Sequence, residues 1–367
     1  MRPDELPGAV REKAAIVGLD DVSLLIVDKR QLVLSPLPEI DGTVLEIDGT
    51  DAGRCFRESV VVSVVEDDRV RHWFPVLDGT SRIGVLGGLA RPDDSLAAVR
   101  GAQLAQLAAE LLVSKAGYGD HIVNAGRRRE LSLAAEIRWS LVPPLTFLSP
   151  DVSIAGFLEP AYDLAGDTFD YAVNANTVHT AIFDAVGHGI EASRIANMAL
   201  LSYRHARRRG LGLLETYAEM GNAIEASFER SAYATAQLAQ LDLPDGSFRW
   251  INAGHPPPVL VRRGEPAREL TGRPVPPAGI GDETPEIHEV GLQPGDVALF
   301  YSDGITEARS DDDTMFGLDE MVRMLDDALA AGTNPPEIVR QIVHAAVEHQ
   351  GGEAVDDATV LLLGWRL

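Results

Sequence analysis

Cysteine, lysine and long apolar runs are scarce in this sequence, and each scarcity excludes a class of protein. The one cysteine, Cys55, cannot form an internal disulfide and has no partner for a zinc site. No apolar run approaches the roughly 20 residues that a membrane helix needs. The acidic N-terminus lacks the basic and then apolar start of a signal peptide. We therefore expect a cytoplasmic protein that does not enter the membrane.

The charge balance excludes further partners. The formal net charge is −24, and only three residues are lysine. A protein this acidic repels nucleic acid and anionic membrane surfaces as general partners. The sequence contains no Gly-rich loop that ends in Gly-Lys-Ser or Gly-Lys-Thr, so a P-loop enzyme has no support. The arginine runs at 127–129 and 207–209 are interpreted as solvated helix ends.

The chain is long enough for two or three domains, and the first spans residues 1–91. Apolar and β-branched runs predict strands at 22–27, 31–36 and 60–65, with a short helix at 51–56 and a hairpin near 79–86. This α/β order resembles a GAF-type sensory domain, which implies a regulatory role. The alternative is a structural or dimerising domain without a ligand.

Residues 92–142 are predicted to form a helical linker. Apolar residues recur at helical spacing through two segments, which Gly117-Tyr-Gly119 separates and Pro143-Pro144 ends. Such a linker forms a homodimer through a parallel stalk, or it packs onto one of the flanking lobes. The sequence leaves both alternatives open.

Residues 143–367 are rich in strands, and together with the first lobe they place the chain in the α+β class. Strands outnumber the helices that could connect parallel neighbours, so the sheets are expected to be antiparallel. Helices are predicted at about 189–208, 212–229, 317–330 and 335–349. The expected architecture is an α-β-β-α sandwich, with two antiparallel sheets flanked by helices.

In this second lobe a repeated pattern places an aspartate where an apolar run meets a glycine or a turn. Asp167 follows a glycine, Asp184 and Asp303 each end an apolar run, and Asp356 precedes the last one. Carboxylates beside buried strands are costly to desolvate unless they are paired or bound to a cation, and no lysine lies near them. Oxygen ligands of this kind favour a hard cation, Mg²⁺ or Mn²⁺.

Six ordered motifs carry a resemblance to a known family. They are Ile137-Arg-Trp-Ser-Leu-Val-Pro-Pro144, Pro160-Ala-Tyr-Asp-Leu-Ala-Gly-Asp-Thr-Phe-Asp170, Phe183-Asp-Ala-Val-Gly-His-Gly189, Asn252-Ala-Gly-His-Pro-Pro257, Tyr301-Ser-Asp-Gly-Ile-Thr-Glu-Ala308 and Asp356-Asp-Ala-Thr-Val-Leu361. Each motif alone is weak, but all six in this order are specific. Residues 130–367 thus resemble the metal-dependent Ser/Thr protein phosphatases of the PPM type, in the bacterial SpoIIE and RsbU branch.

The resemblance implies a site with two Mn²⁺ or Mg²⁺ ions that activate a water for attack on phosphorus. Asp184 is then the bridging carboxylate, with the backbone carbonyl of Ala185 beside it. Asp167 serves the first ion, and Asp303 and Asp356 serve the second. Each of these aspartates has an alternative as a strand-end cap, a turn residue or a solvated side chain.

The implied function is a protein serine/threonine phosphatase that acts on a small phosphorylated regulatory protein, of the anti-sigma-factor antagonist type. The first lobe and the linker would then regulate activity by shifting the helices that shape the metal site. Two alternatives stay open: a catalytically silent module that binds a phosphoprotein, and a two-metal phosphatase of a small phosphorylated metabolite.

Other residues of the motifs are expected to be structural. His188 and His255 are interpreted as a helix start and a turn residue, and Asp357 as a turn or cap residue. Asp163 and Asp170 are expected to support the site without binding metal. One departure concerns the substrate: Tyr162 stands where many family members carry an arginine that grips phosphate. The sequence does not identify what replaces that arginine.

Overall fold

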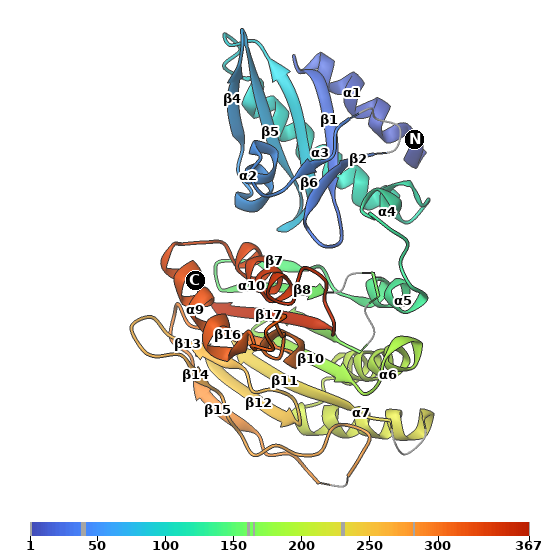
Figure 1. Cartoon of the computed structure of the whole chain (residues 1–367), viewed down its shortest axis with the longest axis vertical. Coiled ribbons are helices and arrows are strands. Elements are labelled where there is room, and N and C mark those ends of the chain that lie inside the picture. Colours follow the sequence, from blue (N-terminus) through green and yellow to red (C-terminus); the bar gives the residue numbers. More distant parts are fainter. Residues whose placement is uncertain are drawn as a thin grey trace. The chain divides into compact units, whose positions relative to one another are not determined.

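The computed structural model describes residues 2–37, 42–159, 162–163, 166–228, 232–281 and 283–366. Four residues of the second motif, Pro160, Ala161, Leu164 and Ala165, lie outside these ranges. The chain folds into two compact units, Met1–Glu130 and Leu131–Leu367 (Figure 1).

The first unit is built on one antiparallel sheet of six strands in its described part, in the order β3-β2-β1-β6-β5-β4. Its elements are η1 (Pro3–Glu5), α1 (Leu6–Ile16), β1 (Asp20–Val27), β2 (Val33–Pro36), β3 (Leu45–Glu46), α2 (Asp51–Glu58), β4 (Val62–Glu66), β5 (Arg69–Asp78), β6 (Ser81–Ala90), α3 (Ala97–Ala116) and α4 (His121–Ala125). Helix α2 begins where the Thr50 hydroxyl accepts a hydrogen bond from the Gly53 amide, as a capping residue does. The strands and the helix predicted from the sequence are therefore present.

Helix α3 belongs to this unit. It packs on the sheet through small residues, and Gly101 lies so close to Phe74 that a Cβ there would come 2.1 Å from the ring. Leu104 and Leu112 are buried in the same core, whereas Leu107 is exposed. The structure thus divides the predicted linker 92–142 between the two units at Glu130. A helix with an apolar face looks the same in sequence whether it covers a sheet or a partner helix, and a homodimer through this segment stays a prediction.

The second unit is an α-β-β-α sandwich, as expected. Its elements are α5 (Leu133–Leu141), β7 (Thr146–Leu148), β8 (Val152–Glu159), β9 (Thr168–Asn174), β10 (Thr177–Ala185), α6 (Gly189–Arg208), α7 (Leu213–Ser227), β11 (Ala234–Asp242), β12 (Ser247–Ala253), β13 (Val259–Val261), β14 (Arg268–Glu269), β15 (His288–Gly291), β16 (Val297–Tyr301), α8 (Asp303–Thr306), α9 (Gly317–Ala330), α10 (Pro335–His349) and β17 (Ala358–Trp365). In the described part the strands form two sheets, ordered β15-β12-β11-β10-β9 and β14-β13-β16-β17-β8-β7. Neighbouring strands pair antiparallel throughout these orders.

Three apolar layers hold this sandwich together. Side chains from both sheets, among them Phe169, Phe248 and Phe300, fill the space between them. Helices α6 and α7 cover the outer face of the first sheet, and α9 and α10 cover that of the second (Figure 1). Burial of apolar surface at about 25 cal/mol per Å² is the main stabilising term in such layers. The layers align the two sheets so that β10 and β16 end on the same side of the sandwich.

A helix needs about 20 mostly apolar residues to cross the hydrocarbon core of a bilayer. Among the described residues, no helix has both the length and the apolar character needed to span a membrane.

Candidate metal centre

The four predicted metal-ligating aspartates come from the ends of both sheets. Asp167 lies directly before β9, and Asp184 is the penultimate residue of β10, which pairs with β9. Asp303 begins the short helix α8 after β16, and Asp356 lies just before β17, which pairs with β16. Each sheet therefore contributes two of the four carboxylates.

Gly166 connects two of these segments. Its carbonyl accepts a hydrogen bond of 3.2 Å from the Ala185 amide. A Cβ at Gly166 would lie 2.7 Å from the Ala185 carbonyl oxygen and 3.1 Å from Asp184 Oδ1. Only glycine leaves room for this approach, so the loop before Asp167 lies against the end of β10.

Asp357 connects the same loop to the other sheet. Its Oδ2 accepts hydrogen bonds from the Gly166 amide at 2.6 Å and from the Asp167 amide at 3.0 Å. Its own amide donates to Asp356 Oδ1 at 2.8 Å. Gly304 is tightly placed here too, because a Cβ on it would lie 2.1 Å from the Asp357 carbonyl oxygen. The Asp357 side chain therefore fixes the backbone on which Asp167 stands.

Asp167 is the most deeply buried of the four, with 2% of its surface exposed. Burial raises the pKa of its carboxyl group well above the usual range, and the charges of Asp184 and Asp357 raise it further. The hydroxyl groups of Ser302 and Thr359 lower that pKa. Among the described residues, Asp167 Oδ2 is buried without a hydrogen-bond partner.

Burial and neighbouring charges also raise the pKa values of Asp184 and Asp303. Burial is the largest cause that raises the pKa of Asp184 to about 7, and the neighbouring charges of Asp303 and Asp356 add to it. Burial also raises the pKa of Asp303, with a further contribution from the charge of Asp356. The carboxylates therefore destabilise one another's charged forms, and a bound cation would relieve this repulsion.

The donor set fits a hard divalent ion. In the ranges that the structure describes, no group of three or more His, Cys, Asp or Glu side chains already converges on one point. The fit lies instead in the chemistry of the donors: a buried Asp167 oxygen without a partner, and aspartates whose mutual repulsion a cation would relieve. Carboxylate and carbonyl oxygens are the ligands that Mg²⁺ and Mn²⁺ prefer.

Three supporting residues were not assigned a role from the sequence. The Ser302 hydroxyl accepts a hydrogen bond from the Thr359 amide at 2.9 Å, and both side chains lie near Asp167. Arg138 on α5 is fully buried; burial lowers its pKa to about 10, whereas the charges of Asp357 and Asp167 raise it. These residues stand in the recognised motifs, but only the fold brings them to Asp167.

Asp170 and His255 occupy structural positions. The Asp170 carboxylate is buried and pairs with Arg204 at 2.7 Å and with Arg207 at 2.8 Å. His255 is buried, its Nδ1 lies 2.8 Å from the Thr235 hydroxyl, and burial lowers its pKa to about 3. A histidine that stays neutral in this way is unsuited to act as a general acid.

Two further motif residues, His188 and Asp163, are exposed. His188 is the residue before α6, and Asp163 lies on the surface.

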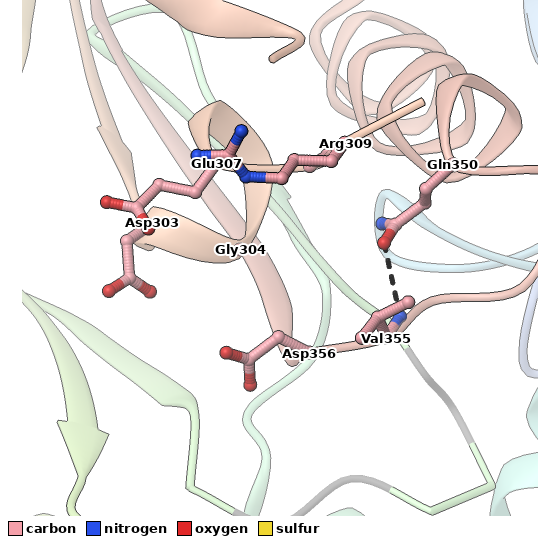
Figure 2. A pocket seen from close by; sticks show the side chains of 8 residues that line it. Asp303, Gly304, Glu307, Arg309, Gln350, Val355 and Asp356 are labelled. Atoms are coloured by element: carbon pink, nitrogen blue, oxygen red, sulfur yellow. Dashed lines mark hydrogen bonds between the residues drawn. The ribbon is translucent and has the colours of Figure 1, made fainter. Parts of the chain in front are cut away.

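A hollow of about 210 Å³ opens beside Asp303 and Asp356 (Figure 2). Its described lining is completed by Gly304, Glu307, Ala308, Arg309, Gln350 and Val355. Figure 2 shows the Asp303 and Asp356 carboxylates pointing into the same open space. The Val355 amide donates to Gln350 Oε1 at 3.3 Å, which ties the loop before β17 to the end of α10.

The match to a known protein family lies within the second unit. Residues 174–366 match the model of the family described as Stage II sporulation protein E (SpoIIE). The phosphoserine phosphatase RsbU of Bacillus subtilis is 20% identical over 237 residues, which cover 64% of this chain and 70% of RsbU. The phosphoserine phosphatase RsbP of the same organism is 24% identical over 187 residues, 49% of this chain and 46% of RsbP.

A solved structure agrees in fold. The SiaA-PP2C domain of Pseudomonas aeruginosa superposes with a TM-score of 0.53 at 22% sequence identity. The match covers 63% of this chain and 94% of that domain. The sandwich of the second unit is therefore a PP2C-like fold.

Proposed function

This chain belongs to the Stage II sporulation protein E family, and on that premise we propose that it is a metal-dependent protein phosphatase acting on phosphoserine or phosphothreonine. The observation that carries the proposal is the gathering of aspartates from four segments at one end of the sandwich. Asp167, Asp184 and Asp303 all have raised pKa values there, partly through one another's charges and that of Asp356.

Two divalent ions, Mn²⁺ or Mg²⁺, would be held by these oxygens. Asp184 would bridge them beside the Ala185 carbonyl, Asp167 would serve one ion, and Asp303 and Asp356 the other. When bound, the ions would supply activation of water and neutralisation of charge on the phosphoryl group. The structural support comes from Gly166, which lies against both Asp184 and Ala185.

The protein's own residues set the geometry for this chemistry. Asp357 holds the backbone amide of Asp167, and the hydroxyl groups of Ser302 and Thr359 favour the charged form of its carboxylate. His255 stays neutral and buried, so the proton of the reaction is not assigned to it.

The substrate part of the proposal rests on the relatives. RsbU and RsbP are described as phosphoserine phosphatases, and we propose a small phosphorylated regulatory protein, of the anti-sigma-factor antagonist type, as the partner of this chain. A cytoplasmic location belongs to the same proposal, since such a regulator acts on transcription. The first unit is proposed to regulate the second, and its resemblance to a GAF domain stays a prediction.

Hydrolysis of p-nitrophenyl phosphate with added Mn²⁺ tests the activity. We expect metal-dependent turnover by the wild type and a loss of at least about 100-fold in Asp184→Ala and Asp303→Ala, because each variant lacks a ligand for an ion that would neutralise transition-state charge. Asp326→Ala, which removes an exposed aspartate on α9, is the matched control and should keep full activity.

The alternatives give different results. Mn²⁺ binding without turnover of either a phosphoprotein or the small ester would indicate a silent binding module. Turnover of small esters alone would indicate a metabolite phosphatase. Full activity in both aspartate variants would refute the proposed site.

A further inference from the structure

The hollow beside the candidate metal centre has predicted metal ligands on one wall and a cationic and an amide side chain on another. Asp303 and Asp356 form the first wall, and Arg309 and Gln350 belong to the second. The hollow has a volume of about 210 Å³ and lies directly beside two of the aspartates that are proposed to bind metal. A substrate phosphate bound at the metal ions would therefore enter or border this hollow.

The charges around the hollow are uneven. Three of the described lining residues are acidic, namely Asp303, Glu307 and Asp356, and Arg309 is the one cation among them. A phosphate monoester carries about two negative charges at neutral pH. Carboxylates repel it, so a fixed cation on the wall is the group that would orient it. Arginine suits this task because its planar fork binds phosphate oxygens through two parallel hydrogen bonds.

Arg309 stands on a fixed backbone. An antiparallel bridge joins it to Met315, and the Phe316 amide donates to the Ala308 carbonyl at 2.8 Å. Figure 2 shows the Arg309 side chain extended alongside the turn that carries Gly304 and Glu307. These backbone contacts hold the loop at Arg309, and the side chain places its guanidinium group at the hollow.

The guanidinium group is also available for a ligand. Its side chain is 47% exposed, and its Nη1 donates to Asp313 Oδ1 at 2.9 Å and to the Asp313 carbonyl at 3.2 Å. Asp313 is itself 83% exposed, and ion pairs this exposed are weak. Within the described residues, Nε and Nη2 of Arg309 form no hydrogen bond, so one donor edge of the guanidinium group is open to an anion.

We propose that Arg309 binds the phosphoryl oxygens of the substrate, opposite the metal ions, and so fixes the orientation of the phosphate. This inference rests on the proposed phosphatase function. It also accounts for Tyr162, which is buried where the family resemblance leads one to expect a phosphate-binding arginine. Arg138 is less suited to that role, because it is fully buried beneath Asp167 and Asp357.

The test compares Arg309→Ala and Arg309→Lys with the wild type at saturating Mn²⁺. We expect Arg309→Ala to raise KM for a phosphoserine peptide about tenfold and to weaken binding of inorganic phosphate by the same factor, since a charge-assisted hydrogen bond is lost. The change in kcat should be smaller, as for a contact made in both ground state and transition state. Arg309→Lys should recover part of the affinity, because lysine keeps the charge but not the two-pronged geometry.

Two control variants separate binding from structure. Asp313→Asn removes the ion pair of Arg309 while keeping a residue that tolerates the left-handed backbone at φ +61°. If Arg309 binds phosphate, this variant keeps or lowers KM; if the ion pair merely holds the loop, it copies Arg309→Ala and the proposal is wrong. Arg323→Ala removes an exposed arginine that pairs with Glu320 and Asp327 on α9 and should change nothing.

Calorimetric titration of the Mn²⁺-loaded protein with inorganic phosphate separates the role of Arg309 from the proposed phosphatase function. An active wild type whose KM and phosphate affinity are unchanged in Arg309→Ala overturns the role of Arg309 and leaves the phosphatase function intact. An inactive wild type that still binds phosphate in an Arg309-dependent way supports the anion site and refutes the enzyme. Absence of both activity and Arg309-dependent binding overturns both.

Discussion

Asp357 offers a test of how the candidate centre is held together, because it accepts hydrogen bonds from the backbone before β9, whereas the side chain of its neighbour Asp356 is exposed. One of its oxygens accepts both the Gly166 amide at 2.6 Å and the Asp167 amide at 3.0 Å. These two donors are buried, and the Asp357→Ala variant would leave them without this acceptor. Hydrogen bonds to charged groups contribute about 1.5–3 kcal/mol each, so the gross loss is about 3–6 kcal/mol.

Two further charges modify this figure. Loss of the Asp357 charge relieves its repulsion of Asp167 and Asp184, but it also removes an attraction for the buried Arg138. Because these effects oppose each other, we expect a net loss of about 2–4 kcal/mol in the free energy of unfolding for Asp357→Ala. Asp357→Asn keeps an acceptor for the two amides and should lose about 1 kcal/mol.

Urea unfolding in EDTA, followed by tryptophan fluorescence, measures these differences, and calorimetry measures Mn²⁺ affinity. Asp356→Ala is the matched comparison: its carboxylate is exposed, so the variant should lose metal affinity with little loss of stability. The argument is refuted if Asp357→Ala unfolds within about 0.5 kcal/mol of the wild type, the range typical of an unimportant surface substitution. Equal losses for the Asn and Ala variants would show that charge, and not the pair of hydrogen bonds, holds the loop.

Two more predictions concern pH and regulation. Burial lowers the pKa of His255 to about 3, so between that value and about 6.5 the unfolded chain binds a proton that the folded chain does not. The His255 contribution to stability should therefore be lost as pH falls, by about 1.4 kcal/mol per unit below pH 6.5. The stability gap between wild type and His255→Gln, measured by urea unfolding, should shrink accordingly from pH 7.5 to 5.5; a constant gap would contradict the burial argument. Deletion of residues 1–125 leaves α5 in place, and we expect it to change Mn²⁺ affinity or turnover if the first unit regulates the second; unchanged affinity and turnover would exclude that regulation.

Much of the second unit could be predicted from local pattern. The helices expected at 317–330 and 335–349 are α9 (Gly317–Ala330) and α10 (Pro335–His349), because their apolar spacing acts within a few turns of chain. The sandwich of antiparallel sheets followed from the excess of strands over connecting helices. The aspartates were recognisable because each stands beside a glycine or at one end of an apolar run.

Other features could not be read from local pattern, since they depend on which side of an element faces which neighbour. The sequence left open whether the linker 92–142 forms a stalk or packs onto a lobe, and in the structure α3 packs on the sheet of the first unit, where Gly101 lies against Phe74. Asp170 was expected to support the metal ligands or the fold, and only the structure identifies Arg204 and Arg207 on α6 as its partners. An amphipathic helix or an acidic side chain carries no mark of its partner in the sequence.

The sequence by itself determined the acidic, nearly cysteine-free composition, the order of the motifs and the ligand types that favour a hard cation. Only the tertiary structure decided that Asp357 holds the loop of Asp167 across 190 residues of chain. It alone also set Arg309 in one hollow with Asp303 and Asp356. The physical reason is that side-chain type sets which interactions are favourable, whereas the packing of two sheets sets which of those groups come within reach.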